Sequence, residues 1–258
     1  MPNVNDIYVL LDQVFPYNLA EKWDNSGLVC GNPDAMVSSV LVSLDITLDV
    51  INEAKELGCN LVISHHPMIY DGIKSVTTDD LTGKKLSALI KNDIAAISCH
   101  TNLDIAENGV NDTLAKKCGL KNVKAFLDVG TNQFLGRIGE VEKTTIADFA
   151  EKVKAALGCN GLRYCDGGKA VQKVAVIGGA GGSFYQEALK AGADTFVTGD
   201  CKYSNFLPSY ELGFNLIDAG HFWTENIIID TLIKTLSNSY PNLKILASQK
   251  NKDIIKFI

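Results

Sequence analysis

The chain has 258 residues, enough for two small lobes or one large α/β unit at roughly 150 residues per domain. Hydrophobic residues make up 46% and charged residues 21%, which is typical of a globular protein and excludes disordered, collagen-like and coiled-coil chains. The 24 basic and 30 acidic residues give a formal charge of −6 without a basic block, so nucleic acid is not an expected partner, whereas a small anionic substrate is compatible.

The cysteines and the apolar runs bear on the cellular compartment. Seven cysteines are scattered without a C-x-x-C pair, which favours reduced thiols over a disulfide framework or a thiolate zinc site. The first residues do not form a signal peptide, because Asn3, Asn5 and Asp6 interrupt them. The apolar runs are far shorter than the ~20 residues of a membrane span. We therefore expect a cytoplasmic protein without a membrane partner.

Strand-like apolar runs alternate with helical patterns along most of the chain. In the first half, the patterns predict a helix at 4–15, a strand at 37–44, a helix at 48–57, a strand at 60–64, a helix at 81–91, a strand at 94–98 and a helix at 110–118. In the second half, they predict a strand at 134–141, a helix at 146–157, a strand at 173–177, a helix at 185–191, a strand at 195–197, a helix at 205–211, a strand at 215–218, a helix at 224–236 and a strand at 244–247.

This alternation indicates right-handed βαβ units and largely parallel sheets. The expected fold class is α/β, with two interlinked α/β lobes. The weakly patterned stretch 121–132 is the best boundary, so we assign residues 1–125 to a first lobe and residues 126–258 to a second lobe with a returning C-terminal segment.

The four histidines have the most informative distribution in the sequence. His65 and His66 follow the strand LVIS, His100 opens the run HTNLD after another strand, and His221 opens HFWTEN after a third. All four therefore stand at or just beyond the carboxyl end of a predicted strand, the edge at which open α/β sheets bind ligands.

Two of these histidine runs carry an acid four residues further on: Asp104 follows His100, and Glu225 follows His221. One such pair is more often a surface ion pair than a ligand set. Three runs that recur in one topological position favour a metal site, and imidazoles with carboxylates suit zinc, manganese, iron or cobalt. The ligands are more numerous than one tetrahedral zinc needs, and two ions bridged by a carboxylate would use them.

Several longer motifs then resemble a known family. The runs EKWDNSGLVCGNP (21–33), SLDIT (43–47), ISHHP (63–67), HTNLD (100–104), IGGAGGS (177–183), VTGD (197–200) and DAGHFWTEN (218–226) occur in the order found in the Nif-three-like dinuclear metal-centre family, whose bacterial members are called GTP cyclohydrolase I type 2 homologues. The chain resembles the short form of the family, a single unit without an inserted domain.

The resemblance implies a ligand set and an assembly. It makes His65, His66, Asp104, His221 and Glu225 the ligands of two divalent metal ions per subunit, in the cleft between the lobes. Glu225 would bridge the ions, with His66 and Asp104 on one and His65 and His221 on the other. His100 would lie beside the metals as a catalytic acid or base. The resemblance also implies a homohexamer. Ser204 stands where the family often has a histidine.

Other motifs leave alternatives open. IGGAGGS is either an anion cradle or a tight strand-to-helix turn, and it lacks the third glycine of a dinucleotide fingerprint. Trp23 and Trp223 either wall the site or pack between lobes. Asp24 and Asp45 either orient ligand imidazoles, or cap helices or lie exposed on the surface.

The expected function is that of a metal-dependent hydrolase, GTP cyclohydrolase I type 2-like by resemblance, acting on an anionic, nucleotide-like substrate. The alternative is a non-catalytic metal-binding scaffold or partner-binding protein, because ligands indicate a metal and not a turnover. A nucleotide binder acting through IGGAGGS is a weaker third possibility.

Overall fold

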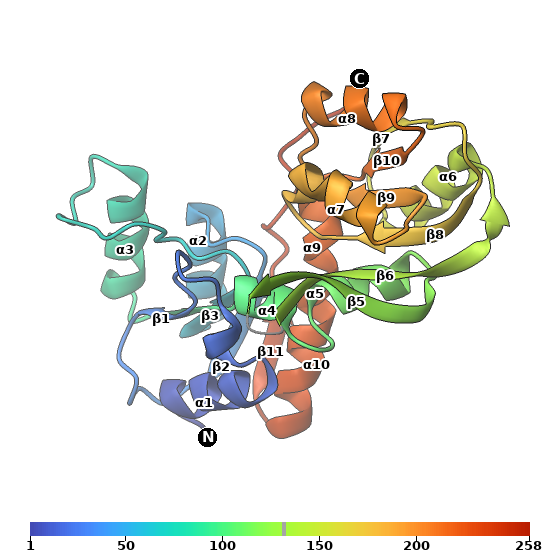
Figure 1. The fold of residues 1–258 in the computed structure, drawn as a ribbon. Helices are drawn as coiled ribbons and strands as arrows, with labels where there is room; N and C mark the ends of the chain where they lie inside the picture. Colours follow the sequence, from blue (N-terminus) through green and yellow to red (C-terminus); the bar gives the residue numbers. More distant parts are fainter. Residues whose placement is uncertain (131–132) are drawn as a thin grey trace. The chain divides into compact units, whose positions relative to one another are not determined.

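The computed structural model describes residues 1–130 and 133–258 (Figure 1). Contacts divide them into two compact units: Met1–Ala106 with Ile228–Lys252, and Glu107–Ile227 with Asp253–Ile258. The boundary predicted after residue 125 falls in the stretch 121–132, of which residues 131–132 lie outside the described part. Residues 121–130 of that stretch form a strand of the second unit.

The first unit contains a mainly parallel sheet. Its strands, in spatial order, are β1 (Gly27–Cys30), β4 (Ala95–Ser98), β3 (Leu61–Ser64), β2 (Ser39–Ser43) and β11 (Lys244–Ala247). β1 runs antiparallel to β4, and the other neighbours are parallel. β2, β3 and β4 are buried throughout, as expected for parallel strands with both faces covered.

The first unit also contains helices. They are α1 (Val4–Val14), the 3-10 turn η1 (Tyr17–Leu19), α2 (Leu48–Leu57), α3 (Leu81–Lys91), α4 (Thr101–Ile105) and α10 (Ile229–Ser239). Of these, α2, α3 and α10 pack on the sheet. The Thr47 side chain accepts a hydrogen bond from the Val50 amide at the start of α2, and Gly58 ends that helix in the left-handed region. α10, drawn in red in Figure 1, packs against β11 and β2.

The second unit contains a mixed sheet. Its strands, in spatial order, are β5 (Lys121–Gly130), β6 (Gln133–Thr144), β8 (Val171–Val176), β9 (Thr195–Thr198), β10 (Asn215–Asp218) and β7 (Arg163–Cys165). β8, β9 and β10 are parallel, whereas β5, β6 and β7 each pair antiparallel with their neighbours.

The helices of the second unit are α5 (Val110–Lys117), α6 (Ile146–Leu157), the 3-10 turn η2 (Gly181–Phe184), α7 (Tyr185–Lys190), α8 (Tyr203–Glu211) and α9 (His221–Glu225), and the 3-10 turn η3 (Asn226–Ile228) links α9 to α10. The core joins α5 and α6 to the sheet through residues such as Leu114, Phe149 and Val174. Among the described residues, none of the helices is both long enough and apolar enough to span a bilayer.

The α/β fold class with two sheets is confirmed, and the differences from the sequence prediction have physical causes. The second sheet is less parallel than expected because β5 and β6 form an antiparallel pair. The side chains of β5 are mostly exposed and show no apolar alternation, so the sequence pattern did not predict this strand. The helix expected at 224–236 begins earlier, at His221, and is broken by η3.

Candidate metal centre

The histidines of the first unit follow neighbouring parallel strands. Ser43, Ser64 and Ser98 are paired in register at the ends of β2, β3 and β4. The residues that come next along the chain therefore meet at one edge of the sheet. This register brings His65 and His66 close to His100, and the ligand atoms of the three imidazoles lie within 4.8 Å of one another.

His65 is fully buried, and its ring orientation is fixed. Its Nδ1 lies 2.8 Å from the carbonyl oxygen of Cys99. Because a carbonyl only accepts hydrogen bonds, Nδ1 is the donor and Nε2 of the neutral ring carries the lone pair. Nε2 lies 3.6 Å from Oδ1 of Asp104, which α4 carries. Two ligands of one tetrahedral zinc ion are separated by roughly 3.3 Å, so this pair has the spacing of two ligands to a shared ion.

The other two histidines of this unit are anchored in the same way. Nδ1 of His66 lies 2.8 Å from Oδ1 of Asp45, and Nδ1 of His100 lies 2.8 Å from Oδ1 of Asp24. Both orienting acids that the sequence analysis considered therefore contact an imidazole. A carboxylate on Nδ1 fixes the tautomer and directs Nε2 as the ligand nitrogen.

Asp24 accepts hydrogen bonds from several neighbours. Burial by itself raises its pKa, but hydrogen bonds from His100, Thr101 and Ser26 outweigh burial and hold the pKa below its ordinary value. Asp24 is therefore an ionised acceptor at neutral pH. The Thr101 amide and hydroxyl both donate to its Oδ2, at 3.0 and 2.6 Å, which ties the segment before β1 to the turn at His100.

The Cys99 thiol does not have the properties of a ligand. Burial raises its pKa to about 12, and the hydrogen bond between its thiol and the Tyr17 hydroxyl does not offset this. The metal-binding form of cysteine is the thiolate, so a protonated Cys99 contributes its carbonyl oxygen to His65 and no sulfur ligand.

The second unit carries the other half of the predicted ligand set on α9. His221 Nε2 lies 3.0 Å from Glu225 Oε2, as the four-residue spacing predicts for one face of a helix. His221 Nδ1 lies 2.7 Å from Asp200 Oδ2. Asp200 follows β9 with a φ of 53°, an unfavourable value for a residue with a Cβ, and its carboxylate there contacts the imidazole. Sequence reasoning missed Asp200, because nothing local distinguishes it from a turn residue.

Gly179 explains part of the glycine-rich run. It has a φ of +63°, and a Cβ added to it would lie 2.0 Å from Glu225 Oε1 and 3.3 Å from His221 Nε2. A side chain at this position would displace the Glu225 carboxylate. The amides of Gly178, Gly179 and Gly181 donate to Asn111, Thr224 and Gly179 respectively, so these hydrogen bonds favour a close-packed turn over an anion cradle.

Gly179→Ala is expected to lower the metal content of the protein by displacing Glu225. Gly168→Ala is the matched control, because Gly168 also has a positive φ, of +79°, but nothing lies within 4 Å of the added Cβ. Both variants should lose about 1–2 kcal/mol of stability to left-handed backbone strain. Only Gly179→Ala should lose metal in elemental analysis of the folded protein, and equal metal content in both variants would contradict this role.

The structure therefore orders the predicted residues into two anchored groups. His65, His66, His100 and Asp104 meet in the first unit, and His221 meets Glu225 in the second. The resemblance implies that His66 and Asp104 share one ion; in the structure, Oδ1 of Asp104 lies 3.6 Å from Nε2 of His65. Ser204 is exposed in the first turn of α8. Trp223 packs on the core of the second unit and donates to Asp253.

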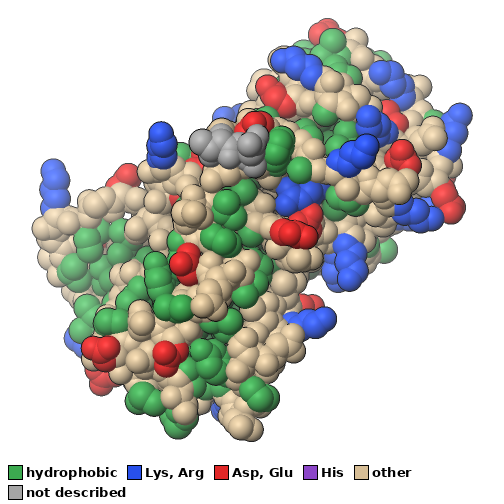
Figure 2. All heavy atoms as spheres, turned by 60° about the horizontal axis from the view of Figure 1, so that its bottom comes forward, with side chains coloured by type: hydrophobic (Ala, Val, Ile, Leu, Met, Phe, Trp, Pro, Cys, Tyr) green, Lys and Arg blue, Asp and Glu red, His purple; other side chains and the backbone are tan. Residues whose placement is uncertain are grey.

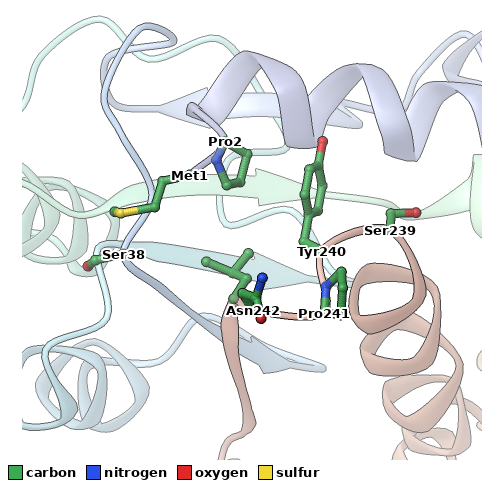
Figure 3. A pocket seen from close by; sticks show the side chains of 8 residues that line it. Met1, Pro2, Ser38, Ser239, Tyr240, Pro241 and Asn242 are labelled. Carbon is green, nitrogen blue, oxygen red and sulfur yellow. The ribbon is translucent and has the colours of Figure 1, made fainter.

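Other surface features lie apart from these groups. A hollow of about 270 Å³ lies between the start of the chain and the end of α10, with Pro2 and Tyr240 on its walls (Figure 3). Its lining contains no member of either group. On the face drawn in Figure 2, basic and acidic side chains are interspersed, and no described histidine is visible.

These observations define an α/β protein in which strand ends hold anchored imidazoles beside carboxylates, a donor set that could hold divalent metal ions. A family model described as Duf34/NIF3 (NGG1p interacting factor 3) matches residues 2–254. The chain belongs to this family, which confirms the resemblance in the sequence motifs.

Individual relatives match along the whole chain. A Clostridium perfringens protein named GTP cyclohydrolase 1 type 2 homolog is 37% identical over 262 residues, which cover 99% of each chain. Among solved structures, the Staphylococcus aureus hypothetical protein SA1388 matches with a TM-score of 0.91 and 33% identity over 99% of each chain. A Bacillus cereus protein related to NIF3 also has a TM-score of 0.91, with 28% identity over 100% of this chain and 99% of its own.

Proposed function

We propose that His65, His66, Asp104, His221 and Glu225 hold two divalent metal ions, with Glu225 as the bridging ligand. The observation that carries this proposal is the common anchoring of the histidines. In His65, His66 and His221, Nδ1 contacts an oxygen acceptor, which leaves Nε2 as the ligand nitrogen.

The spacing within each unit supports an assignment of ligands to ions. His65 Nε2 and Asp104 Oδ1, 3.6 Å apart, would serve one ion, and His221 Nε2 lies 3.0 Å from the bridging carboxylate. His66 would then complete the second ion. Imidazole and carboxylate donors without thiolate suit zinc, manganese, iron or cobalt.

The chemistry we propose is hydrolysis of an anionic, nucleotide-like substrate. Divalent ions at such a site supply Lewis acidity and lower the pKa of coordinated water toward about 7. His100 lies among the ligand histidines, and Asp24 holds its Nδ1, so its Nε2 is placed to carry a proton to or from a substrate. The charge of two divalent ions exceeds that of the two ligand carboxylates, and the resulting local positive charge would attract an anion to an otherwise acidic protein.

The names of the relatives support a purine nucleotide as the first substrate to test, since they refer to GTP cyclohydrolase. The deciding experiment combines elemental analysis of the purified protein with a screen of nucleotides and phosphoesters, with and without chelator. Turnover that chelation abolishes and added metal restores supports the hydrolase. Bound metal without turnover on any substrate would instead support a non-catalytic metal-binding scaffold.

Assembly is a separate prediction. The family resemblance leads us to expect a homohexamer of this 27.9 kDa chain, with a mass near six times that value. Light scattering coupled to size-exclusion chromatography measures this mass directly. A monomer at micromolar concentration would contradict the prediction.

A further inference from the structure

Two exposed aromatic side chains stand beside His100 in the first unit. Trp23 is 58% exposed and Tyr70 is 52% exposed. Their ring centroids lie 5.8 and 6.0 Å from that of His100, and both rings are nearly perpendicular to the imidazole, at 77° and 81°. Large aromatic rings that are exposed to solvent beside a group of histidines are suited to stacking on a planar ligand.

The segment that carries Trp23 is held firmly. The Glu21 amide donates to Thr101 Oγ1 at 2.9 Å, and the indole Nε1 of Trp23 donates to Glu21 Oε2 at 2.5 Å. Asn25 Nδ2 donates to the carbonyl oxygen of Ile69 at 2.8 Å, which links this segment to the residue before Tyr70. Trp23 is therefore presented on an ordered support despite its exposure, which lowers the entropy lost when a ligand binds.

Tyr70 also connects His100 to a hollow of suitable size. It lines a cavity of about 440 Å³ formed by Met68–Ser75, Asp80 and Thr82. Small-molecule sites commonly have volumes of about 300–1,000 Å³. Asp71 and Lys74 lie in this lining, so the cavity offers both a hydrogen-bond acceptor and a cationic donor. Such a pair can contact the ring nitrogens and exocyclic groups of a heterocycle.

We propose that Trp23, Tyr70 and the adjoining cavity form a subsite for a planar nitrogen heterocycle, the ring of a nucleotide-like ligand. The heterocycle stacks on the exposed aromatic faces and its polar edge enters the cavity. The assignment of this subsite to substrate rests on the proposed function. The binding of a heterocycle itself does not, because all of its residues belong to the first unit and none is a proposed metal ligand.

The test compares ligands that differ only in the ring: guanosine 5′-monophosphate, uridine 5′-monophosphate and ribose 5-phosphate. Calorimetry with metal-loaded and metal-stripped protein measures each affinity. We expect the purine nucleotide to bind at least about tenfold more tightly than the ribose phosphate, with the pyrimidine between them. Trp23→Ala and Tyr70→Ala should each weaken purine binding about tenfold, since stacking of a base on one aromatic side chain contributes strongly to affinity.

Matched variants separate stacking from general damage. Trp23→Phe and Tyr70→Phe should keep most of the affinity, because they keep an aromatic face. Tyr210→Ala removes a tyrosine that is 62% exposed on α8 and should change nothing. Equal affinity for nucleotide and ribose phosphate would overturn the proposal. So would alanine variants that alter the mass in light scattering and leave the nucleotide affinity unchanged, because the rings would then belong to a subunit contact.

The two proposals can fail separately. Ring-dependent binding without metal-dependent turnover would preserve the heterocycle subsite and remove the hydrolase. Turnover that neither alanine variant affects would preserve the hydrolase and overturn the assignment of the subsite to its substrate.

Discussion

Glu225→Gln is expected to empty both proposed metal positions, whereas loss of a ligand to one ion should empty only one. The side chain of Glu225 is 5% exposed and lies 3.0 Å from His221 Nε2, and glutamine preserves its size while removing the charge that balances the cations. Loss of an outer-shell partner typically weakens metal binding by 10–100-fold, so loss of a bridging ligand should weaken it by at least about a hundredfold. Elemental analysis after dialysis measures the number of ions retained per chain.

The comparison variants make this result specific. Asp104→Ala should retain about one ion per chain, because Asp104 is proposed to serve only the ion of His65. Glu151→Gln changes an exposed glutamate on α6 and should retain both ions. Melting temperatures without metal should be similar for Glu225→Gln and the unchanged protein. If Glu225→Gln kept two ions, or lost only one, the bridging role would be wrong.

The proximity of the three histidines in the first unit could be predicted from the sequence, because they follow the ends of neighbouring parallel strands. Buried runs such as LVIS and AAIS are recognisable as parallel strands, and their carboxyl ends must meet at one edge of the sheet. The proximity of His65, His66 and His100 follows from that topology and from the register of Ser64 with Ser98. The contact of His221 with Glu225 was only partly predictable: their four-residue spacing fits one face of a helix, but the sequence pattern began that helix at residue 224, after His221.

Asp24 and Asp45 could be named in advance as candidate acceptors, but the acceptors of His65 and His221 and the irregular elements were harder to predict, because they depend on long-range contacts. Asp200 reaches His221 only through a left-handed backbone conformation at the end of β9, and the sequence does not encode that contact locally. The acceptor on His65 is a backbone carbonyl, which has no residue signature at all. β5 was missed since its side chains are mostly exposed, so its pairing with β6 leaves no hydrophobic pattern.

His100→Asn is expected to leave metal binding intact and to reduce turnover by roughly 10²–10⁴-fold. Five other side chains already suffice for two ions that share Glu225, so His100 is not required as a ligand. Its Nδ1 is held by Asp24 at 2.8 Å, which orients Nε2 in the way an acid or base needs. Asparagine keeps a polar side chain of similar reach near Asp24, but it cannot exchange a proton near neutral pH.

Three measurements on His100→Asn distinguish the roles that the geometry permits. The ligand atoms of His65, His66 and His100 lie within 4.8 Å of one another, so a ligand role for His100 would appear as lost metal. A structural role, through the contacts of Asp24 with Thr101 and Ser26, would appear as a lower melting temperature with activity per folded molecule retained. A proton-transfer role would appear as a normal melting temperature, two bound ions and reduced turnover per folded molecule. That last pattern is the one we expect, because Asp24 makes its other hydrogen bonds without the imidazole and can keep the turn folded.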